Sequence, residues 1–118
     1  IAEGKGITIF GDGNQTRDFV YAGDIADGIL DALRTEAANT AYNLSTSGET
    51  SLKELVAILS KVSGKEIVPA YDKPREGDIY RSSLNNAKAK CNLHWEPKIS
   101  LEEGLRRTYE DFAKREGK

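Results

Sequence analysis

The sequence is poor in the residues that form covalent or metal cross-links. Among its 118 residues there is one cysteine, Cys91, one histidine, His94, and no methionine. A single cysteine excludes a disulfide within the chain, and one cysteine with one histidine falls short of the four ligands of a structural zinc site. We therefore expect no metal site in this chain.

Long apolar runs and an excess of one charge are also absent. No stretch approaches the roughly 18 apolar residues of a membrane-spanning helix, and there is no signal-peptide pattern. The 17 Lys and Arg residues nearly balance the 19 Asp and Glu residues, so no basic surface indicates nucleic-acid binding. These absences predict a soluble cytoplasmic protein with one modest core and no nucleic-acid or membrane partner.

The first residues lack features of a helix or strand start. Ile1 is not a methionine, and the opening IAEGKG has neither a helix cap nor an apolar period. It resembles the end of a helix whose beginning is missing. We therefore expect a fragment or a processed piece.

Apolar periodicity predicts about four helices. Two have a capping box, Ser51 with Glu54 and Ser100 with Glu103. In the first helix Asp24 is the expected N-cap, and the apolar residues Ile25, Ile29, Leu30 and Leu33 fall on one face at helical spacing. The predicted helices are 24–34, 52–62, 86–91 and 101–114.

Short apolar runs between these helices predict strands. They do not alternate with the helices in a clean βαβ series. We therefore predict an α/β fold, α+β in isolation, whose sheet is incomplete within this chain. The expected strands are Ile7–Phe10, Phe19–Tyr21, Ala41–Ser45 and Glu66–Tyr71, with 78–84 extended.

A glycine loop, Gly11-Asp12-Gly13-Asn14-Gln15-Thr16, joins the first two predicted strands. Gly11 and Gly13 invite comparison with a dinucleotide-binding fingerprint. The match fails, because Thr16 stands where the third glycine belongs and a strand is expected where a helix should begin. We therefore predict no cofactor role for this loop.

Two arginines lie in or beside polar loops. Arg17 follows the glycine loop, and Arg75 lies in the loop DKPREG. Guanidinium groups from two loops suit a diphosphate, and a carboxylate such as Asp78 suits a ribose hydroxyl. The alternative is that both arginines are solvated or paired with nearby acids. Spacing alone leaves both interpretations open.

Four motifs, in order and across essentially the whole chain, resemble the C-terminal part of the extended short-chain dehydrogenase/reductase family. Within that family, the pattern is most similar to the UDP-glucose (UDP-galactose) 4-epimerases. The motifs are IFGDGNQTRDFVY (Ile9–Tyr21), Tyr42-Asn43 followed by Gly48, REGDI (Arg75–Ile79) and LHWEP (Leu93–Pro97).

The resemblance implies a substrate site for a UDP-sugar. Arg17 and Arg75 would hold the diphosphate, and Asp78 would bond the ribose. Phe10 would lie along the uracil, whose edge would bond backbone groups of Thr8 and Phe10. The sequence departs from the family pattern elsewhere: Ala22-Gly23 replace Val and an acid, Asn85 replaces Asp, and His94 replaces a glycine.

The family's cofactor motif, T-G-x-x-G-x-x-G, and its catalytic Tyr-x-x-x-Lys are both absent from this sequence. The resemblance therefore implies a parent enzyme, expected to be a homodimer, whose N-terminal Rossmann domain binds NAD and carries catalysis. Residues 1–118 would form the single C-terminal nucleotide-sugar-binding region. This region would be inactive alone, with no catalytic residue and no cofactor of its own.

Two alternatives remain. The parent could be a nucleotide-sugar dehydratase or decarboxylase on the same scaffold. The chain could also be a binding or scaffold module that kept the fold without catalysis.

Overall fold

The computed structural model describes residues 1–36 and 39–116. Over these residues it contains four helices: α1 (Ala22–Arg34), α2 (Leu52–Ser63), α3 (Ala87–Leu93) and α4 (Leu101–Arg115). Four short strands form two separate sheets: β1 (Thr8–Phe10) runs parallel to β4 (Ala70–Asp72), and β2 (Thr16–Arg17) runs antiparallel to β3 (Thr50–Ser51). The predicted small α+β architecture is confirmed.

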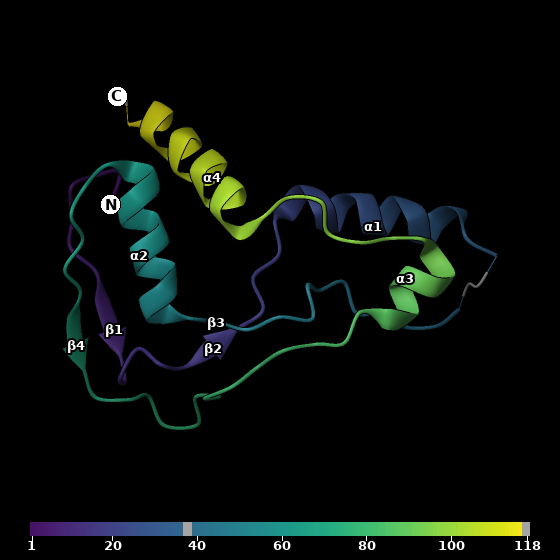
Figure 1. The fold of residues 1–118 in the computed structure, drawn as a ribbon, viewed down its shortest axis with the longest axis horizontal. Helices are drawn as coiled ribbons and strands as arrows, with labels where there is room; N and C mark the ends of the chain where they lie inside the picture. The colour runs from purple at the N-terminus through teal and green to yellow at the C-terminus, as the bar shows by residue number, and fades with distance from the viewer. Residues whose placement is uncertain (37–38, 117–118) are drawn as a thin grey trace.

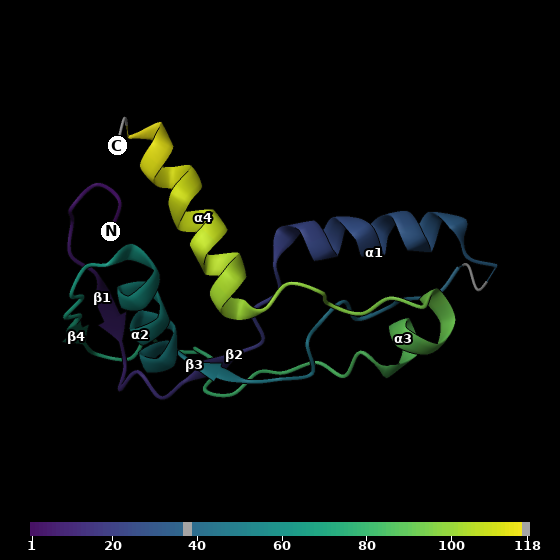
Figure 2. The same cartoon turned by 45° about the horizontal axis from the view of Figure 1, so that its top comes forward.

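The molecule is flat and open. It measures 47 × 36 × 19 Å, and its radius of gyration is 16.6 Å, against about 13.5 Å for a compact domain of this length. Figure 1 shows one half with β1, β4, α2 and α4 and another with α1 and α3, joined by extended segments. Figure 2 shows the same separation after a turn about the horizontal axis.

The helix ends follow the local sequence signals. The Ser51 hydroxyl accepts a hydrogen bond from the Glu54 N–H at 3.1 Å, and the Ser100 hydroxyl accepts one from the Glu103 N–H at 3.2 Å. Gly64 ends α2 with φ of 69°, a conformation that glycine adopts without steric cost. His94 ends α3 with φ of 54°, so the position where the family has glycine does need positive φ.

The start of α1 differs from the prediction. Tyr21 is the N-cap residue, and Asp24 lies in the first turn of the helix, 3% exposed. The Asp24 carboxylate accepts hydrogen bonds from the backbone N–H groups of Lys98 and Ile99, at 3.2 and 3.0 Å. The prediction of Asp24 as the N-cap was wrong, because its carboxylate binds a distant segment instead of the helix end.

Two predicted strands, Phe19–Tyr21 and Ala41–Ser45, are not strands in this structure. The Tyr21 carbonyl accepts hydrogen bonds from the first turn of α1, so this residue belongs to a helix start. Ser45 is held by side chains: its hydroxyl donates to the Leu84 carbonyl, and its carbonyl accepts from the Asn86 amide. A strand requires a ladder of backbone bonds, and here side-chain bonds replace it. Of the run 66–71, only Ala70 and Tyr71 belong to a strand, β4, and 78–84 contains no strand.

The largest buried cluster lies between α1 and α3. Ala89, Leu93 and Trp95 are at most 6% exposed, and the Trp95 indole Nε1–H donates to the Asp24 carbonyl at 2.8 Å. Gly28 of α1 makes room here, because a Cβ on it would lie 2.6 Å from Leu44 Cδ1. The core therefore sits away from both sheets.

One face of α1 is not covered. Ile29, Leu30 and Leu33, which the sequence places on one helix face, are 55%, 47% and 78% exposed. The buried face of α1 lies beside them, at Asp24 and Gly28. None of the described helices is both long and apolar enough to cross a membrane.

Candidate functional site

The glycine loop is fixed by α2 and β4. The first backbone N–H groups of α2, at Leu52 and Lys53, donate to the carbonyls of Gln15 and Gly13 at 3.1 and 3.0 Å. The Gly11 N–H donates to the Asp72 carbonyl at the end of β4, also at 3.0 Å. The loop is thereby held in place without a helix of its own.

This arrangement does not fit a dinucleotide. A helix N-terminus binds phosphate through unpaired N–H groups, but here those of α2 are taken by loop carbonyls. A Cβ on Gly13 would also lie 2.9 Å from Lys53 Cγ, so that space is filled by a side chain. The described residues form no cradle for NAD at this loop.

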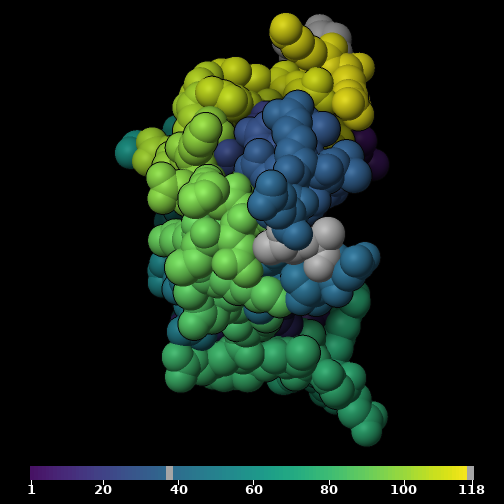
Figure 3. All heavy atoms as spheres, turned by 90° about the vertical axis from the view of Figure 1, so that its right-hand side faces the viewer, coloured from purple at the N-terminus to yellow at the C-terminus, as the bar shows by residue number. Residues whose placement is uncertain are grey.

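A pocket of about 180 Å³ lies beside the loop. Its floor and walls come from the end of β1, the glycine loop and the segment between β4 and α3. That segment forms the lower edge of the molecule in Figures 1 and 3. The lining includes an aromatic ring, a guanidinium group, a carboxylate and a phenol, from Phe10, Arg75, Asp78 and Tyr80.

Three of the five predicted site residues line this pocket: Phe10, Arg75 and Asp78. The Arg75 guanidinium lies over the Phe10 ring, 4.2 Å from its centroid, which is a cation–π arrangement. Arg17 lies next to the pocket and forms an ion pair with Asp78, Nη2 to Oδ1 at 3.2 Å. Arg17 thus contacts the Asp78 carboxylate, while Arg75 contacts the Phe10 ring. The pairing of Arg17 with an acid is the alternative that the sequence had left open.

Thr8 lies two residues before Phe10 on β1 and does not line the pocket. In the parallel ladder, the Ile7 carbonyl accepts a hydrogen bond from the Ala70 N–H, and the Gly11 N–H donates to the Asp72 carbonyl, both at 3.0 Å. Since alternate residues of a strand direct their backbone groups to opposite edges, Thr8 and Phe10 direct theirs away from β4. Their N–H and C=O groups therefore face the free edge of β1.

Two contacts at the pocket were missed by sequence reasoning. Gln15 is 7% exposed, and its Nε2 donates to the Phe10 carbonyl at 2.7 Å. The Tyr80 hydroxyl donates to Asp12 Oδ2 at 3.2 Å. For Gln15, its place in the first motif was the only sequence feature that could have indicated a role at the pocket. Nothing in the sequence connects Asp12 with Tyr80.

The pKa values of Asp12 and Tyr80 both depart from their ordinary values, and the contact between the two groups contributes to each shift. The Asn14 N–H, and after it the Tyr80 hydroxyl, lowers the pKa of the Asp12 carboxyl. Partial burial, and after it the Asp12 carboxylate, raises the pKa of Tyr80. Asp12 is therefore a carboxylate and Tyr80 a neutral phenol at neutral pH.

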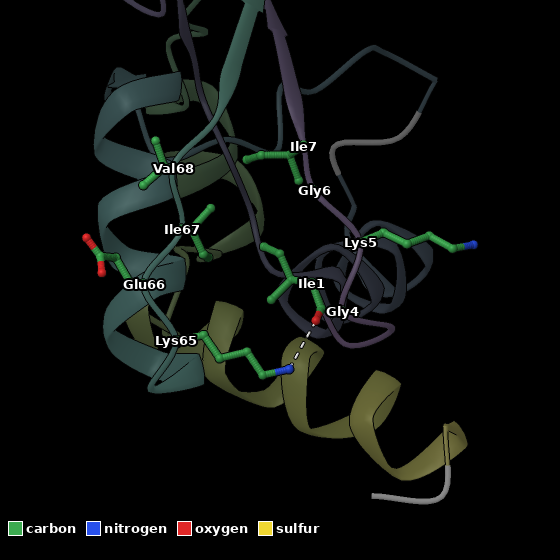
Figure 4. A pocket seen from close by; sticks show the side chains of 9 residues that line it. All are labelled: Ile1, Gly4, Lys5, Gly6, Ile7, Lys65, Glu66, Ile67 and Val68. Carbon is green, nitrogen blue, oxygen red and sulfur yellow. Dashed lines mark hydrogen bonds between the residues drawn. The ribbon is translucent and has the colours of Figure 1, made fainter.

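A larger pocket, of about 450 Å³, lies at the start of the chain. Figure 4 shows that the Lys5 and Glu66 side chains point away from it, while Lys65 Nζ donates to the Ile1 carbonyl. No cluster of polar side chains converges there. Within residues 1–36 and 39–116, no group of three or more His, Cys, Asp and Glu residues could hold a metal ion.

Comparison with known proteins identifies the family. The family model described as GDP-mannose 4,6 dehydratase matches residues 1–108. A putative UDP-glucose 4-epimerase of Methanocaldococcus jannaschii is 50% identical over 99 residues, which are 84% of this chain and 32% of that protein. A UDP-glucuronic acid decarboxylase of Arabidopsis thaliana is 34% identical over 109 residues, 92% of this chain and 25% of that protein.

Solved structures similar to this chain include enzymes of the same kind as these sequence relatives. The UDP-glucose 4-epimerase of Thermotoga maritima with UDP-glucose superposes with a TM-score of 0.92 and 40% identity over 97% of this chain and 37% of its own. The UDP-glucuronic acid 4-epimerase of Bacillus cereus, in complex with UDP-glucuronic acid and NAD, gives a TM-score of 0.86 and 34% identity, over 96% and 36%.

The chain therefore belongs to the family of nucleotide-sugar epimerases and dehydratases that this model describes, and the resemblance found in the four motifs is confirmed. It spans about a third of the length of the relatives it matches. That share agrees with the expected C-terminal part of an extended short-chain dehydrogenase.

Proposed function

We propose that this chain is the UDP-sugar-binding part of a UDP-glucose 4-epimerase-like enzyme. The observation that carries the proposal is the pocket beside the glycine loop, where Phe10, Arg75 and Asp78 meet and Arg17 is tied to Asp78. A flat ring, two guanidinium groups and a carboxylate match the base, the diphosphate and the ribose of a nucleotide-sugar.

In this proposal Arg17 and Arg75 bind the diphosphate, and Asp78 bonds the ribose. The base lies along Phe10, and the free edge of β1 supplies backbone groups of Thr8 and Phe10 to its polar edge. Arg17 already donates to the Thr16 carbonyl and to Asp78, and since a guanidinium has five N–H groups, donors remain for a phosphate.

The proposal includes a second domain that holds NAD and the catalytic residues. Two observations support it: the glycine loop does not fit NAD, and the apolar face of α1 at Ile29, Leu30 and Leu33 is exposed. Exposed apolar patches of this kind mark surfaces that pack against another part of a protein. In such an enzyme NAD would supply the oxidation and re-reduction of the sugar. The homodimer and the cytoplasmic location remain predictions.

The test is UDP binding by the full protein that carries this chain, measured by isothermal titration calorimetry. Arg17→Ala and Arg75→Ala should each raise the Kd for UDP by about 10-fold or more, since a charge-assisted hydrogen bond contributes about 1.5–3 kcal/mol. Arg106→Ala is the matched control, because this arginine forms ion pairs with Glu103 and Glu110 of its own helix and should leave the Kd unchanged.

Steady-state kinetics separates binding from catalysis. Arg17→Ala should chiefly raise KM for the UDP-sugar, because a diphosphate contact is made in both the ground state and the transition state. No UDP binding at millimolar concentration, or a large fall in kcat at unchanged KM, would contradict the proposal. The product formed from the UDP-sugar distinguishes an epimerase from a dehydratase or a decarboxylase. A protein that converts no UDP-sugar would favour the scaffold module.

A further inference from the structure

The segment 73–81 carries two residues of the candidate site but has little structure of its own. All its residues are exposed, and it contains neither helix nor strand. At its start, the Asp72 carbonyl accepts from the Gly11 N–H. The contacts at the other end of the segment, after Asp78, therefore determine where Arg75 and Asp78 lie.

The far end is held by Glu49. The Arg81 guanidinium donates to both carboxylate oxygens of Glu49, from Nε at 3.0 Å and from Nη2 at 2.7 Å. The Thr16 hydroxyl donates to the same carboxylate at 2.8 Å. Glu49 directly precedes β3, and Thr16 begins β2, so one carboxylate joins both strands of the small sheet to the segment.

Neighbouring contacts extend this attachment into the pocket. The Thr16 N–H donates to the Tyr80 carbonyl at 2.8 Å, one residue before Arg81. Three residues before Arg81, the Asp78 carboxylate meets Arg17. A displaced Arg81 would thus move the residues that form one wall of the pocket.

We propose that Glu49 and Arg81 are positioning residues, whose ion pair holds the segment 73–81 so that Arg75 and Asp78 face Phe10. The inference rests on the proposed UDP-sugar site, because ordering that site is the role given to the ion pair. Glu49 and Arg81 do not line the pocket; they act through the segment.

The geometry distinguishes this pair from an ordinary surface ion pair. Exposed pairs contribute little to stability unless they are bidentate or belong to a network, and this pair is both. Consistently, the Arg81 guanidinium and, after it, the Thr16 hydroxyl lower the pKa of the Glu49 carboxyl to about 2. The Arg81 side chain is 73% exposed, so the expected effect is several-fold rather than a complete loss.

The first measurement is amide hydrogen exchange by NMR in the full protein that carries this chain. The Thr16 N–H reports on the attachment directly, since it donates to the Tyr80 carbonyl. Glu49→Gln and Arg81→Ala should each speed its exchange about fivefold. The amides of Leu52 and Lys53, which donate to the glycine loop, should not change.

The second measurement is the Kd for UDP. Each single variant should raise it about fivefold, and the double variant should raise it no further, because both substitutions remove the same contact. Glu110→Gln, which removes an acid paired with Arg106 on α4, is the matched control and should leave Kd and Thr16 exchange unchanged. Arg81→Lys should restore affinity only in part, since lysine lacks the planar fork.

The outcomes are separable. Unchanged Thr16 exchange in both variants overturns the positioning role, whatever the protein binds. Faster exchange with an unchanged Kd, in a protein that binds UDP, also overturns it. A wild-type protein that binds no UDP contradicts the proposed function and the ordering of a UDP site, while exchange still decides whether the pair holds the segment.

Discussion

The two halves of the molecule are held together by different forces. The core half, made of α1, α3 and residues 41–47 and 94–99, contains the buried cluster around Trp95. Its polar side chains are buried as well, at Ser45, Asn86 and Asp24, with 1–3% exposure. The site half, made of both sheets, α2 and residues 11–16 and 73–81, has one buried large apolar residue among those described, Ile9.

The site half is instead connected by hydrogen bonds and ion pairs between exposed groups, such as Arg17 with Asp78 and Arg81 with Glu49. Burial of apolar area supplies most of a domain's stability, whereas exposed ion pairs supply little. The difference suggests that stability and ligand binding depend on separate residues. Substitutions in the core half should lower stability first, and substitutions in the site half should weaken binding first.

The largest effect is expected in the core half, for Trp95→Ala. Trp95 is 3% exposed, and its indole N–H bonds the Asp24 carbonyl. Truncation of a buried Trp costs about 3–5 kcal/mol, a large share of the roughly 5–15 kcal/mol that keeps a domain folded. Urea denaturation of the full protein measures this loss.

Phe112→Ala is the control for this variant, because Phe112 is 52% exposed on α4 and surface substitutions usually change stability by about 0.5 kcal/mol or less.

At temperatures where the Trp95→Ala variant stays folded, the Kd of this variant for UDP should equal that of the wild type. If affinity fell as steeply as stability, the two halves would not be separable.

A smaller effect is expected for Gly28→Ala. Its new methyl group would lie 2.6 Å from Leu44 Cδ1 and 3.1 Å from Trp95 Nε1. Overpacking costs about 1–3 kcal/mol, from which the better helix propensity of alanine subtracts about 1 kcal/mol. The melting temperature should fall in the wild-type background and rise, or stay level, when Leu44→Ala provides the space. A fall of equal size in both backgrounds would show that Leu44 is not the obstacle.

Sequence reasoning succeeded where the signal is local. The N-cap hydrogen bonds of Ser51 and Ser100 depend on residues three positions apart, and the structure contains both. It failed where the partner is distant. The carboxylate of Asp24 is satisfied by N–H groups some seventy residues later, and a good N-cap residue type carries no sign of that.

The candidate site shows the same division. The motifs brought attention to Arg17, Arg75 and Asp78, and the ion pair between Arg17 and Asp78 spans 61 positions. That pair was within reach because both residues lie in recognisable motifs. Glu49 and Arg81 lie 32 positions apart and outside those motifs, so only the folded structure connects them.

The smallest expected effect concerns the protonation of Glu49. Its pKa is lowered from 4.5 to about 2, chiefly by hydrogen bonds from Arg81 and then Thr16. A depressed carboxyl pKa means that the contact contributes fully above the ordinary value and is lost as the pH falls through the folded value. The site half should therefore loosen between about pH 4.5 and 2, while the neutral contacts of Ser45, Asn86 and Trp95 have no such dependence.

An NMR titration of the Glu49 side-chain carboxyl carbon tests this directly. The midpoint should lie near pH 2 in the wild type and return toward the ordinary value of 4.5 in Arg81→Ala, because that variant removes both guanidinium donors. Arg106→Ala should leave the Glu49 midpoint in place, since this arginine bonds Glu103 and Glu110. A wild-type midpoint near 4.5 would mean that the pair is not formed in solution. The segment 73–81 would then depend on the contacts of Tyr80 and Asp78 alone.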